Sequence, residues 1–121
     1  MAPTIRFDNE KSAAVLVLSG KVIAEDNGVL REHIEKTLKS PAPVKAIDLT
    51  DVEFLDSYAL GQIIYYCTNP DGRRGKIFII NRRIGGGSYI ERLIDISELR
   101  QIFTIVESTE AAISGGCAAG G

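Results

Sequence analysis

Residues 54–64, FLDSYALGQII, join two apolar runs of different periodicity. The run before them, residues 44–49, is short and almost continuously apolar, as is typical of a buried strand. The run after them repeats every three or four positions, as in the buried stripe of a helix, at Leu60, Ile63, Ile64 and Cys67. The stretch is therefore predicted to be a strand-to-helix junction, with residues 51–56 as the loop and a helix that begins near Ser57.

Outward from this junction, the chain alternates between strand-like and helix-like segments. Short apolar or alternating runs predict strands at residues 4–8, 13–18, 21–23, 44–49, 76–80 and 104–106. Apolar residues at helical spacing predict helices near residues 30–38, 57–67, 88–95 and 97–103, and from residue 108 onwards. This order predicts an α/β fold with βαβ crossovers, in which helices pack on a mixed, partly parallel β-sheet.

The composition indicates an ordinary globular domain. The 121 residues carry a net charge of −2, which argues against a nucleic-acid surface. The sequence contains neither a long apolar span nor the pattern of a secretory signal. Two cysteines and one histidine predict neither a disulfide framework nor a zinc site. We expect a cytoplasmic protein without cofactor or metal, with one domain over residues 1–113 and a disordered, Gly/Ala-rich tail over residues 114–121.

The polar pair Asp56–Ser57 at the junction has two compatible interpretations. In open α/β sheets, functional groups gather beyond the carboxyl ends of the strands. Either side chain can serve as the N-cap, because its oxygen can accept a hydrogen bond from a free amide of the first helical turn. Alternatively, Ser57 is exposed there because it accepts a phosphate, which the positive end of the helix dipole tolerates.

Several motifs resemble the STAS-domain family of anti-sigma factor antagonists. The resemblance covers nearly all of residues 4–113. It rests on LSGKV at 18–22, IDLTDV at 47–52, FLDS at 54–57, LIDISEL at 93–99, FTI at 103–105 and STEAA at 108–112. The resemblance implies a STAS-like mixed sheet with helices packed on it, and a binding module rather than an enzyme.

The family's junction motif is usually Asp-Ser-Ser/Ala-Gly-Leu-Gly, and its first serine falls on Ser57. The resemblance implies that the partner, an anti-sigma factor with serine kinase activity, phosphorylates this residue. The unphosphorylated protein would bind the anti-sigma factor and free the sigma factor, and the phosphorylated protein would let go. A PP2C-type phosphatase would reset the switch. Desolvation and like-charge repulsion, to which Asp56 adds, would oppose binding of the phosphorylated form.

The chain departs from that motif at Tyr58 and Ala59, where the family has a small residue and a glycine. Tyr58 shares a helix face with Gly61, Gln62 and Tyr65, and tyrosine is enriched at binding hot spots. We therefore expect that face to contact the partner. The full set of expected partner-binding residues is Asp56, Tyr58, Gly61, Gln62, Tyr65, Asp26, Asn27, Gly86 and Ser88.

Other readings stay open at this point. The domain could instead belong to a large stress-signalling scaffold in which the same serine modulates assembly. It could also be a small enzyme or a phosphate- or nucleotide-binding domain that uses the amides of residues 85–87, although the loop lacks the ending of a P-loop. Arg82 and Arg83 are expected at the carboxyl end of their strand, as solvated residues or as contacts for an acidic group. His33 and Cys67 are expected to be structural, and no catalytic constellation is predicted.

Overall fold

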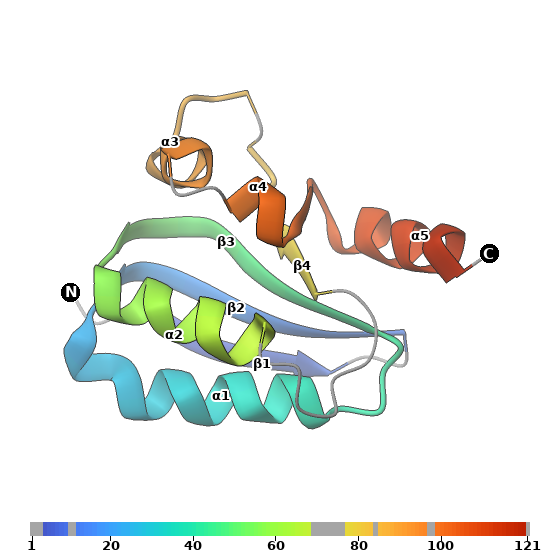
Figure 1. Ribbon diagram of the computed structural model, residues 1–121, viewed down its shortest axis with the longest axis horizontal. Helices are drawn as coiled ribbons and strands as arrows, with labels where there is room; N and C mark the ends of the chain where they lie inside the picture. The colour runs from blue at the N-terminus through green and yellow to red at the C-terminus, as the bar shows by residue number, and fades with distance from the viewer. Residues whose placement is uncertain (1–3, 10–11, 69–76, 84, 97–98, 121) are drawn as a thin grey trace.

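The computed structural model describes residues 4–9, 12–68, 77–83, 85–96 and 99–120 (Figure 1). The strands are β1 (Thr4–Asn9), β2 (Ala13–Val22), β3 (Val44–Leu55), β4 (Ile77–Ile80) and β5 (Thr104–Val106). The helices are a 3-10 turn η1 (Ala24–Asp26), α1 (Asn27–Lys39), α2 (Ser57–Thr68), α3 (Tyr89–Ile96), α4 (Leu99–Ile102) and α5 (Thr109–Gly120). None of the described helices is both long and apolar enough to cross a membrane.

The five strands form one mixed sheet in the order β1-β2-β3-β4-β5. β1 pairs antiparallel with β2, and the remaining neighbours pair in parallel. Each parallel pair is joined by a helical crossover: α1 joins β2 to β3, α2 joins β3 to β4, and α3 with α4 joins β4 to β5. The predicted α/β fold with a partly parallel sheet is confirmed.

The sheet separates two apolar cores of unequal size. Because the parallel strands are added in one direction, crossovers of one hand place their helices on the same face. The larger core accordingly combines residues of α1, α2 and α3, including Ile34, Ile63 and Ile94, with inward-facing strand residues such as Ile47. The smaller core lies on the other face, where Ala112 of α5 is buried. Burial of each large aliphatic side chain contributes about 1.5–3 kcal/mol to stability.

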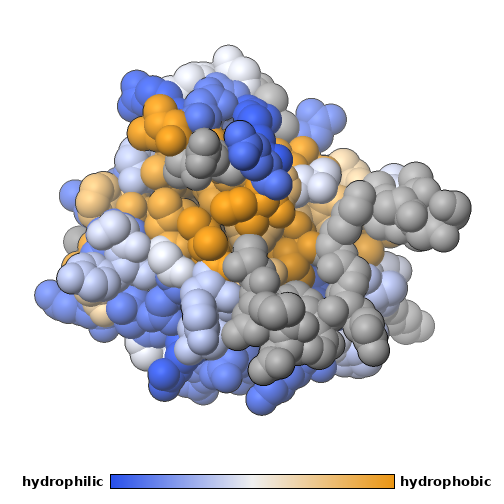
Figure 2. Space-filling model, viewed as in Figure 1, coloured by the Kyte–Doolittle hydropathy of each residue, from blue (hydrophilic) through white to orange (hydrophobic). Residues whose placement is uncertain are grey.

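The surface viewed in Figure 2 reflects this division. Polar side chains cover its lower part, and apolar side chains gather at its centre, between the levels of α2 and α3 (Figures 1 and 2). α2 and α3 both contribute partly buried residues to the larger core: Leu60, Ile64, Tyr89 and Leu93. α2 is thus fixed to the core along one side, as its predicted apolar stripe requires.

β3 is longer than the sequence predicted. We expected residues 51–56 to form a loop, but β3 continues through Leu55 and pairs with β2 as far as Val22. The register shifts between Val17 and Ser19, and again between Gly20 and Lys21, so that 12 residues of β3 lie beside 10 residues of β2. Such bulges accommodate the extra residues. The polar residues of this segment suggested a loop, yet the segment also buries Val52 and Leu55.

β2 and the C-terminal segment also bear on the sequence predictions. β2 is continuous over Ala13–Val22, so the break expected at Ser19–Gly20 is wrong; Gly20 has a φ of 76°, a backbone conformation that glycine tolerates within the bulged strand. The backbone of α5 is helical as far as Gly120, and the disorder expected for residues 114–121 stays a prediction. Residues 76, 97 and 98, which we assigned to a strand and a helix, lie outside the described residues.

Candidate functional site at the β3–α2 junction

Asp56 is the N-cap of α2. Its carboxylate oxygen Oδ1 accepts a hydrogen bond from the amide of Ala59 at 2.9 Å, and its carbonyl oxygen accepts one from the amide of Leu60 at 2.9 Å. Of the two candidates that the sequence left open, Asp56 therefore performs the capping, and Ser57 is the first residue of the helix.

Asp56 also ties α2 to the connection between β2 and α1. Its second carboxylate oxygen, Oδ2, accepts a hydrogen bond from the amide of Ala24 at 2.8 Å, and its own amide donates to the carbonyl oxygen of Val22 at 3.2 Å. Asp26 plays a similar local part, since its Oδ2 accepts a hydrogen bond from the amide of Ile23 at 3.0 Å. Both carboxylates, expected as partner contacts, thus also fix the backbone around the junction.

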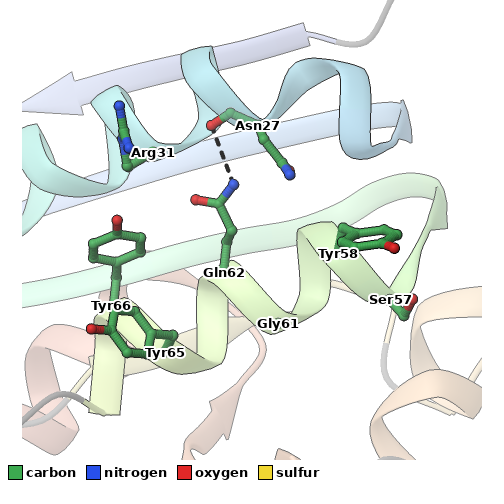
Figure 3. A pocket seen from close by; sticks show the side chains of 8 residues that line it. All are labelled: Asn27, Arg31, Ser57, Tyr58, Gly61, Gln62, Tyr65 and Tyr66. Carbon is green, nitrogen blue, oxygen red and sulfur yellow. Dashed lines mark hydrogen bonds between the residues drawn. The ribbon is translucent and has the colours of Figure 1, made fainter.

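Ser57 is exposed, and capping does not occupy its side chain. Its hydroxyl has no hydrogen-bond partner within the described part of the chain. Figure 3 shows Ser57 at the very start of α2, with Tyr58 beside it. The hydroxyl that the sequence singled out is therefore accessible and uncommitted.

A groove runs between α1 and α2, and we call it the α1–α2 groove (Figure 3). It has a volume of about 400 Å³, within the range of ligand pockets. Its lining comprises Asn27, Arg31, Ser57, Tyr58, Gly61, Gln62, Tyr65 and Tyr66. The predicted shared face of Tyr58, Gly61, Gln62 and Tyr65 is thus confirmed as a spatial arrangement, and α1 adds Asn27 and Arg31 to it.

The aromatic residues of the α1–α2 groove are unusually accessible for their size. Tyr58 is 68% exposed and Tyr65 is 60% exposed. Tyr65 meets Tyr66 edge-on, with ring centroids 5.0 Å apart and an interplanar angle of 88°. Exposed tyrosines beside a concave surface are typical of protein-binding sites, because a large rigid ring gives contact area at a low cost in conformational entropy.

The side chain of Gln62 meets the backbone of Asn27 across the α1–α2 groove. Nε2 of Gln62 donates a hydrogen bond to the carbonyl oxygen of Asn27 at 3.4 Å. The side-chain oxygens of both residues, Oε1 of Gln62 and Oδ1 of Asn27, are buried and have no partner among the described residues. The groove therefore holds two acceptors that lack a donor.

Gly86 and Ser88 lie outside the α1–α2 groove, in the connection between β4 and α3. Oγ of Ser88 accepts a hydrogen bond from the amide of Glu91 at 3.2 Å, so Ser88 caps α3. α3 approaches the junction through Tyr89, whose hydroxyl lies 3.1 Å from the amide nitrogen and 3.2 Å from the carbonyl oxygen of Leu55. Gly86 and Ser88 are thus separate from Ser57 but belong to a loop that α3 anchors to the same junction.

The glycine loop already holds an anionic group from its own chain. The carboxylate of Glu91 accepts hydrogen bonds from the amides of Gly85 and Gly87, the latter at 2.7 Å. Gly85 and Gly87 have positive φ angles of 89° and 69°, which let these amides point toward one acceptor. Because Glu91 occupies both amides, the geometry disfavours a phosphate or nucleotide site at residues 85–87.

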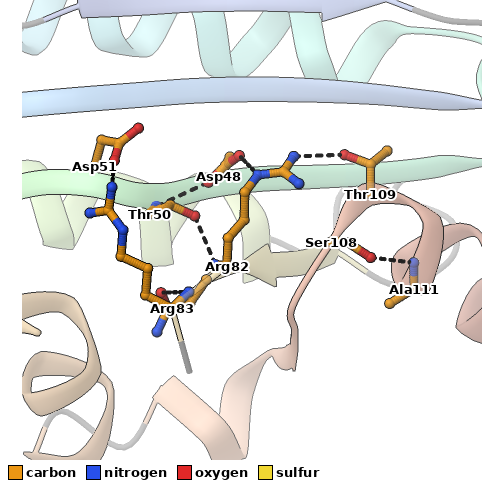
Figure 4. Close-up of polar contacts among 9 residues, drawn as sticks. Asp48, Thr50, Asp51, Arg82, Arg83, Ser108, Thr109 and Ala111 are labelled. Carbon is orange, nitrogen blue, oxygen red and sulfur yellow. Dashed lines mark hydrogen bonds and ion pairs between the residues drawn. The ribbon is translucent and has the colours of Figure 1, made fainter. Parts of the chain in front are cut away.

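Arg82 and Arg83 are paired with acidic residues of β3 (Figure 4). Nε of Arg82 lies 3.2 Å from Oδ2 of Asp48, and Nη2 of Arg83 lies 3.0 Å from Oδ1 of Asp51. Arg82 also donates to Oγ1 of Thr109 at the start of α5, at 3.4 Å. Neither arginine lines the α1–α2 groove, so the structure does not bring them to Ser57.

The remaining polar candidates have local partners. Nδ1 of His33 is 2.9 Å from the carbonyl oxygen of Val29, within one turn of α1. Cys67 is buried in the larger core, as its place in the apolar stripe predicted. Across the described part of the chain, no group of three or more histidine, cysteine, aspartate or glutamate residues has the arrangement of a metal site.

The family model of the STAS domain matches residues 4–112, nearly the whole described chain. The chain belongs to the STAS domain family. No curated protein matches the sequence closely enough to add a relative. The predicted end of the domain at residue 113 stays a prediction.

Solved structures share the fold of this STAS domain at low sequence identity. An anti-sigma factor antagonist from Mycobacterium paratuberculosis has a TM-score of 0.76 at 21% identity, over 94% of this chain and 93% of that one. A proposed anti-sigma factor antagonist from Thermotoga maritima has a TM-score of 0.70 at 18% identity, over 92% of both chains. An uncharacterized protein from Shewanella loihica with a SpoIIAA-like fold has a TM-score of 0.59 at 18% identity, over 95% of this chain and 94% of that one.

Sequence reasoning missed two features of this STAS domain. Arg31 lies on the α1 side of the groove, but in the sequence it is one of several charged residues of an amphipathic helix. Glu91 was not singled out, although a glutamate three residues after Ser88 has the spacing of a capping box. That spacing could have drawn attention to Glu91, whereas nothing in the sequence distinguishes Arg31.

Proposed function

We propose that this STAS domain is an anti-sigma factor antagonist. It binds an anti-sigma factor that is also a serine kinase, and so releases the sigma factor; phosphorylation of Ser57 switches this binding off, and a PP2C-type phosphatase restores it. The fold shared with an anti-sigma factor antagonist supports the class of function. The observation that carries the proposal is the exposed Ser57 hydroxyl at the first position of α2, left free because Asp56 caps the helix.

The position of Ser57 suits a phosphate without disturbing the fold. A phosphate there would lie near the first-turn amides of α2 and the positive end of its dipole, which favour negative charge. The apolar stripe that holds α2 in the core faces away from this position, since Ala59 and Ile63 are buried while Ser57 is exposed. Phosphorylation would therefore alter the surface and leave the core in place.

The same phosphate would oppose a partner that covers the α1–α2 groove. It would add a charge of about −1.5 to −2 at one end of the groove. Figure 3 shows Arg31 at the opposite end, beyond Gln62, so this cation does not neutralise the phosphate. A partner that buries Ser57 would have to strip water from an unpaired dianion, which costs several kcal/mol.

The domain would act by binding rather than by catalysis. The exposed Ser57 has no histidine among the residues that line its groove, and His33 is bonded within its own helix. We place the exchange of partners in the cytoplasm, where sigma factors act on RNA polymerase.

Incubation with a serine-kinase anti-sigma factor encoded in the same genome, together with ATP, tests the proposal. Intact-mass analysis is expected to show one added phosphate on the wild type and none on Ser57→Ala. Ser12→Ala, which changes an exposed serine outside the junction, is the matched control and should still accept the phosphate. If no anti-sigma kinase of that genome phosphorylates the domain, or if the phosphate maps to another residue, the proposal is wrong.

A further inference from the structure

Two side-chain oxygens at the α1–α2 groove lack a hydrogen-bond donor among the described residues. The bond from Nε2 of Gln62 to the carbonyl oxygen of Asn27 fixes the orientation of the Gln62 amide and leaves its Oε1 buried without a described partner. Oδ1 of Asn27 is likewise buried and has no described partner. A buried acceptor without a donor costs about 1–3 kcal/mol. Because both oxygens are buried, a ligand with N–H groups reaches them only when the amides turn outward, and it then recovers that free energy.

The charge of the α1–α2 groove has one sign. Of its eight described lining residues, Arg31 alone carries a charge, and Arg31 takes part in no ion pair within the described part of the chain. A guanidinium group binds a carboxylate through two parallel hydrogen bonds. The groove therefore complements a ligand that combines N–H donors with a negative charge.

The floor of the α1–α2 groove is open because of a glycine. Gly61 lies within α2, and a Cβ atom built on it would meet no atom within 4 Å. A glycine inside a helix costs about 1 kcal/mol relative to alanine, and no close contact requires one here. Tyr58 and Tyr65 rise on either side of Gly61 along α2 (Figure 3).

We infer that the α1–α2 groove binds an extended, acidic peptide segment of the partner. This inference rests on the proposed function and names the chemistry of its partner. Backbone N–H groups of the segment donate to Asn27 and Gln62, and one of its carboxylates pairs with Arg31. The segment crosses Gly61 between the two exposed tyrosines. Phosphorylated Ser57 then excludes it by like-charge repulsion at the end of the groove, which explains how one phosphate switches the whole contact.

Filling the groove tests this inference directly. Gly61→Leu places a side chain on the floor of the groove. Gly28→Leu is its matched control. Like Gly61, Gly28 is a helical glycine with no atom within 4 Å of an added Cβ, but it lies in α1 and does not line the groove. In calorimetric titration with the anti-sigma factor, Gly61→Leu and Arg31→Glu are each expected to weaken binding at least about tenfold, equivalent to 1.4 kcal/mol. Gly28→Leu should bind as the wild type does.

A second measurement separates this inference from the proposed function. Capped oligoglutamate and capped oligolysine peptides are titrated into the isotope-labelled domain, and NMR follows the side chains of Asn27, Gln62 and Arg31. Oligoglutamate should shift these signals in the wild type and in Gly28→Leu, but not in Gly61→Leu, and oligolysine should not shift them.

The outcomes distinguish the two ideas. If the anti-sigma factor binds Gly61→Leu as tightly as the wild type while Ser57 is still phosphorylated, the proposed function stands and the groove inference is wrong. If no anti-sigma factor binds but oligoglutamate occupies the groove, the proposed function fails and the groove retains its ligand chemistry. Equal shifts with both peptides, or with neither, overturn the inference.

Discussion

The β3–α2 junction and the β4–α3 loop are both connections from a parallel strand to a helix, yet they differ in what they leave free. In the β4–α3 loop, the glycine amides are taken by Glu91 and the cap of α3 is taken by Ser88. At the junction, Asp56 satisfies the helix cap but the Ser57 hydroxyl and the side-chain oxygens of Asn27 and Gln62 stay without described partners.

The difference indicates which kind of connection carries a functional site in such a fold. Glycine-rich loops before helices attract attention as anion sites, but an internal carboxylate can fill them. Uncommitted polar groups beside exposed aromatic rings are a stronger indication, because an isolated domain gains nothing from leaving buried acceptors unpaired. By this criterion we propose that the junction with its groove is the binding region and that the glycine loop is structural.

The largest expected effect concerns Asp56. Asp56→Ala removes the acceptor of the Ala59 amide in the helix cap and of the Ala24 amide across the junction. We expect the free energy of unfolding to fall by about 2 kcal/mol, measured by urea denaturation. Asp51→Ala, which breaks only an exposed ion pair with Arg83, should cost no more than about 0.5 kcal/mol. Equal effects of the two substitutions would contradict the capping role of Asp56.

A smaller loss of stability is expected when the amides of the glycine loop are freed. Glu91→Ala frees the amides of Gly85 and Gly87, and we expect a loss of about 1 kcal/mol in the free energy of unfolding. Inorganic phosphate should then raise the melting temperature of the variant but not that of the wild type, because only the variant has free amides. If phosphate stabilises both proteins equally, the comparison between the two connections does not hold.

A gain of stability is expected at Gly61. Gly61→Ala introduces a Cβ that meets no neighbouring atom and favours the helix, so the free energy of unfolding should rise by up to about 1 kcal/mol. Thermal unfolding followed by circular dichroism measures this change. A destabilised variant would show that the position is constrained by packing, against the view that its glycine keeps the groove open.

The smallest change in stability is expected for Ser57, the neighbour of Asp56 in the junction. Ser57→Ala removes a side chain that neither caps the helix nor packs in the core, so stability should change by no more than about 0.5 kcal/mol. Urea denaturation beside Asp56→Ala provides the comparison. A loss as large as that of Asp56→Ala would assign the cap to Ser57 instead.

Much of the fold could be predicted from the sequence because its signals are local. The stripe of Leu60, Ile63 and Cys67 predicted α2, and an acidic residue beside Ser57 predicted its cap. The extension of β3 to Leu55 could not be predicted in this way, because it depends on bulges formed with β2. The two strands are distant in the sequence, as the pairing of Lys21 with Phe54 shows.

The candidate site was predicted on its α2 side and at Asn27, whereas Arg31 of α1 was not predicted. Tyr58, Gly61, Gln62 and Tyr65 share a face of one helix, which periodicity shows. The approach of Asn27 to Gln62 joins residues 35 positions apart, and it depends on how α1 packs against α2. Local patterns determine which face of a helix is buried, but the residues that face each other across two helices follow from tertiary packing.

The central claim is that a phosphate on Ser57 switches binding of an anti-sigma factor. Calorimetric titration of one anti-sigma factor into the domain, unphosphorylated and then fully phosphorylated on Ser57, tests it most directly. Phosphorylation is expected to weaken binding at least about tenfold, or 1.4 kcal/mol, without lowering the melting temperature of the domain. Equal affinity of the two forms, each still folded, would contradict the account.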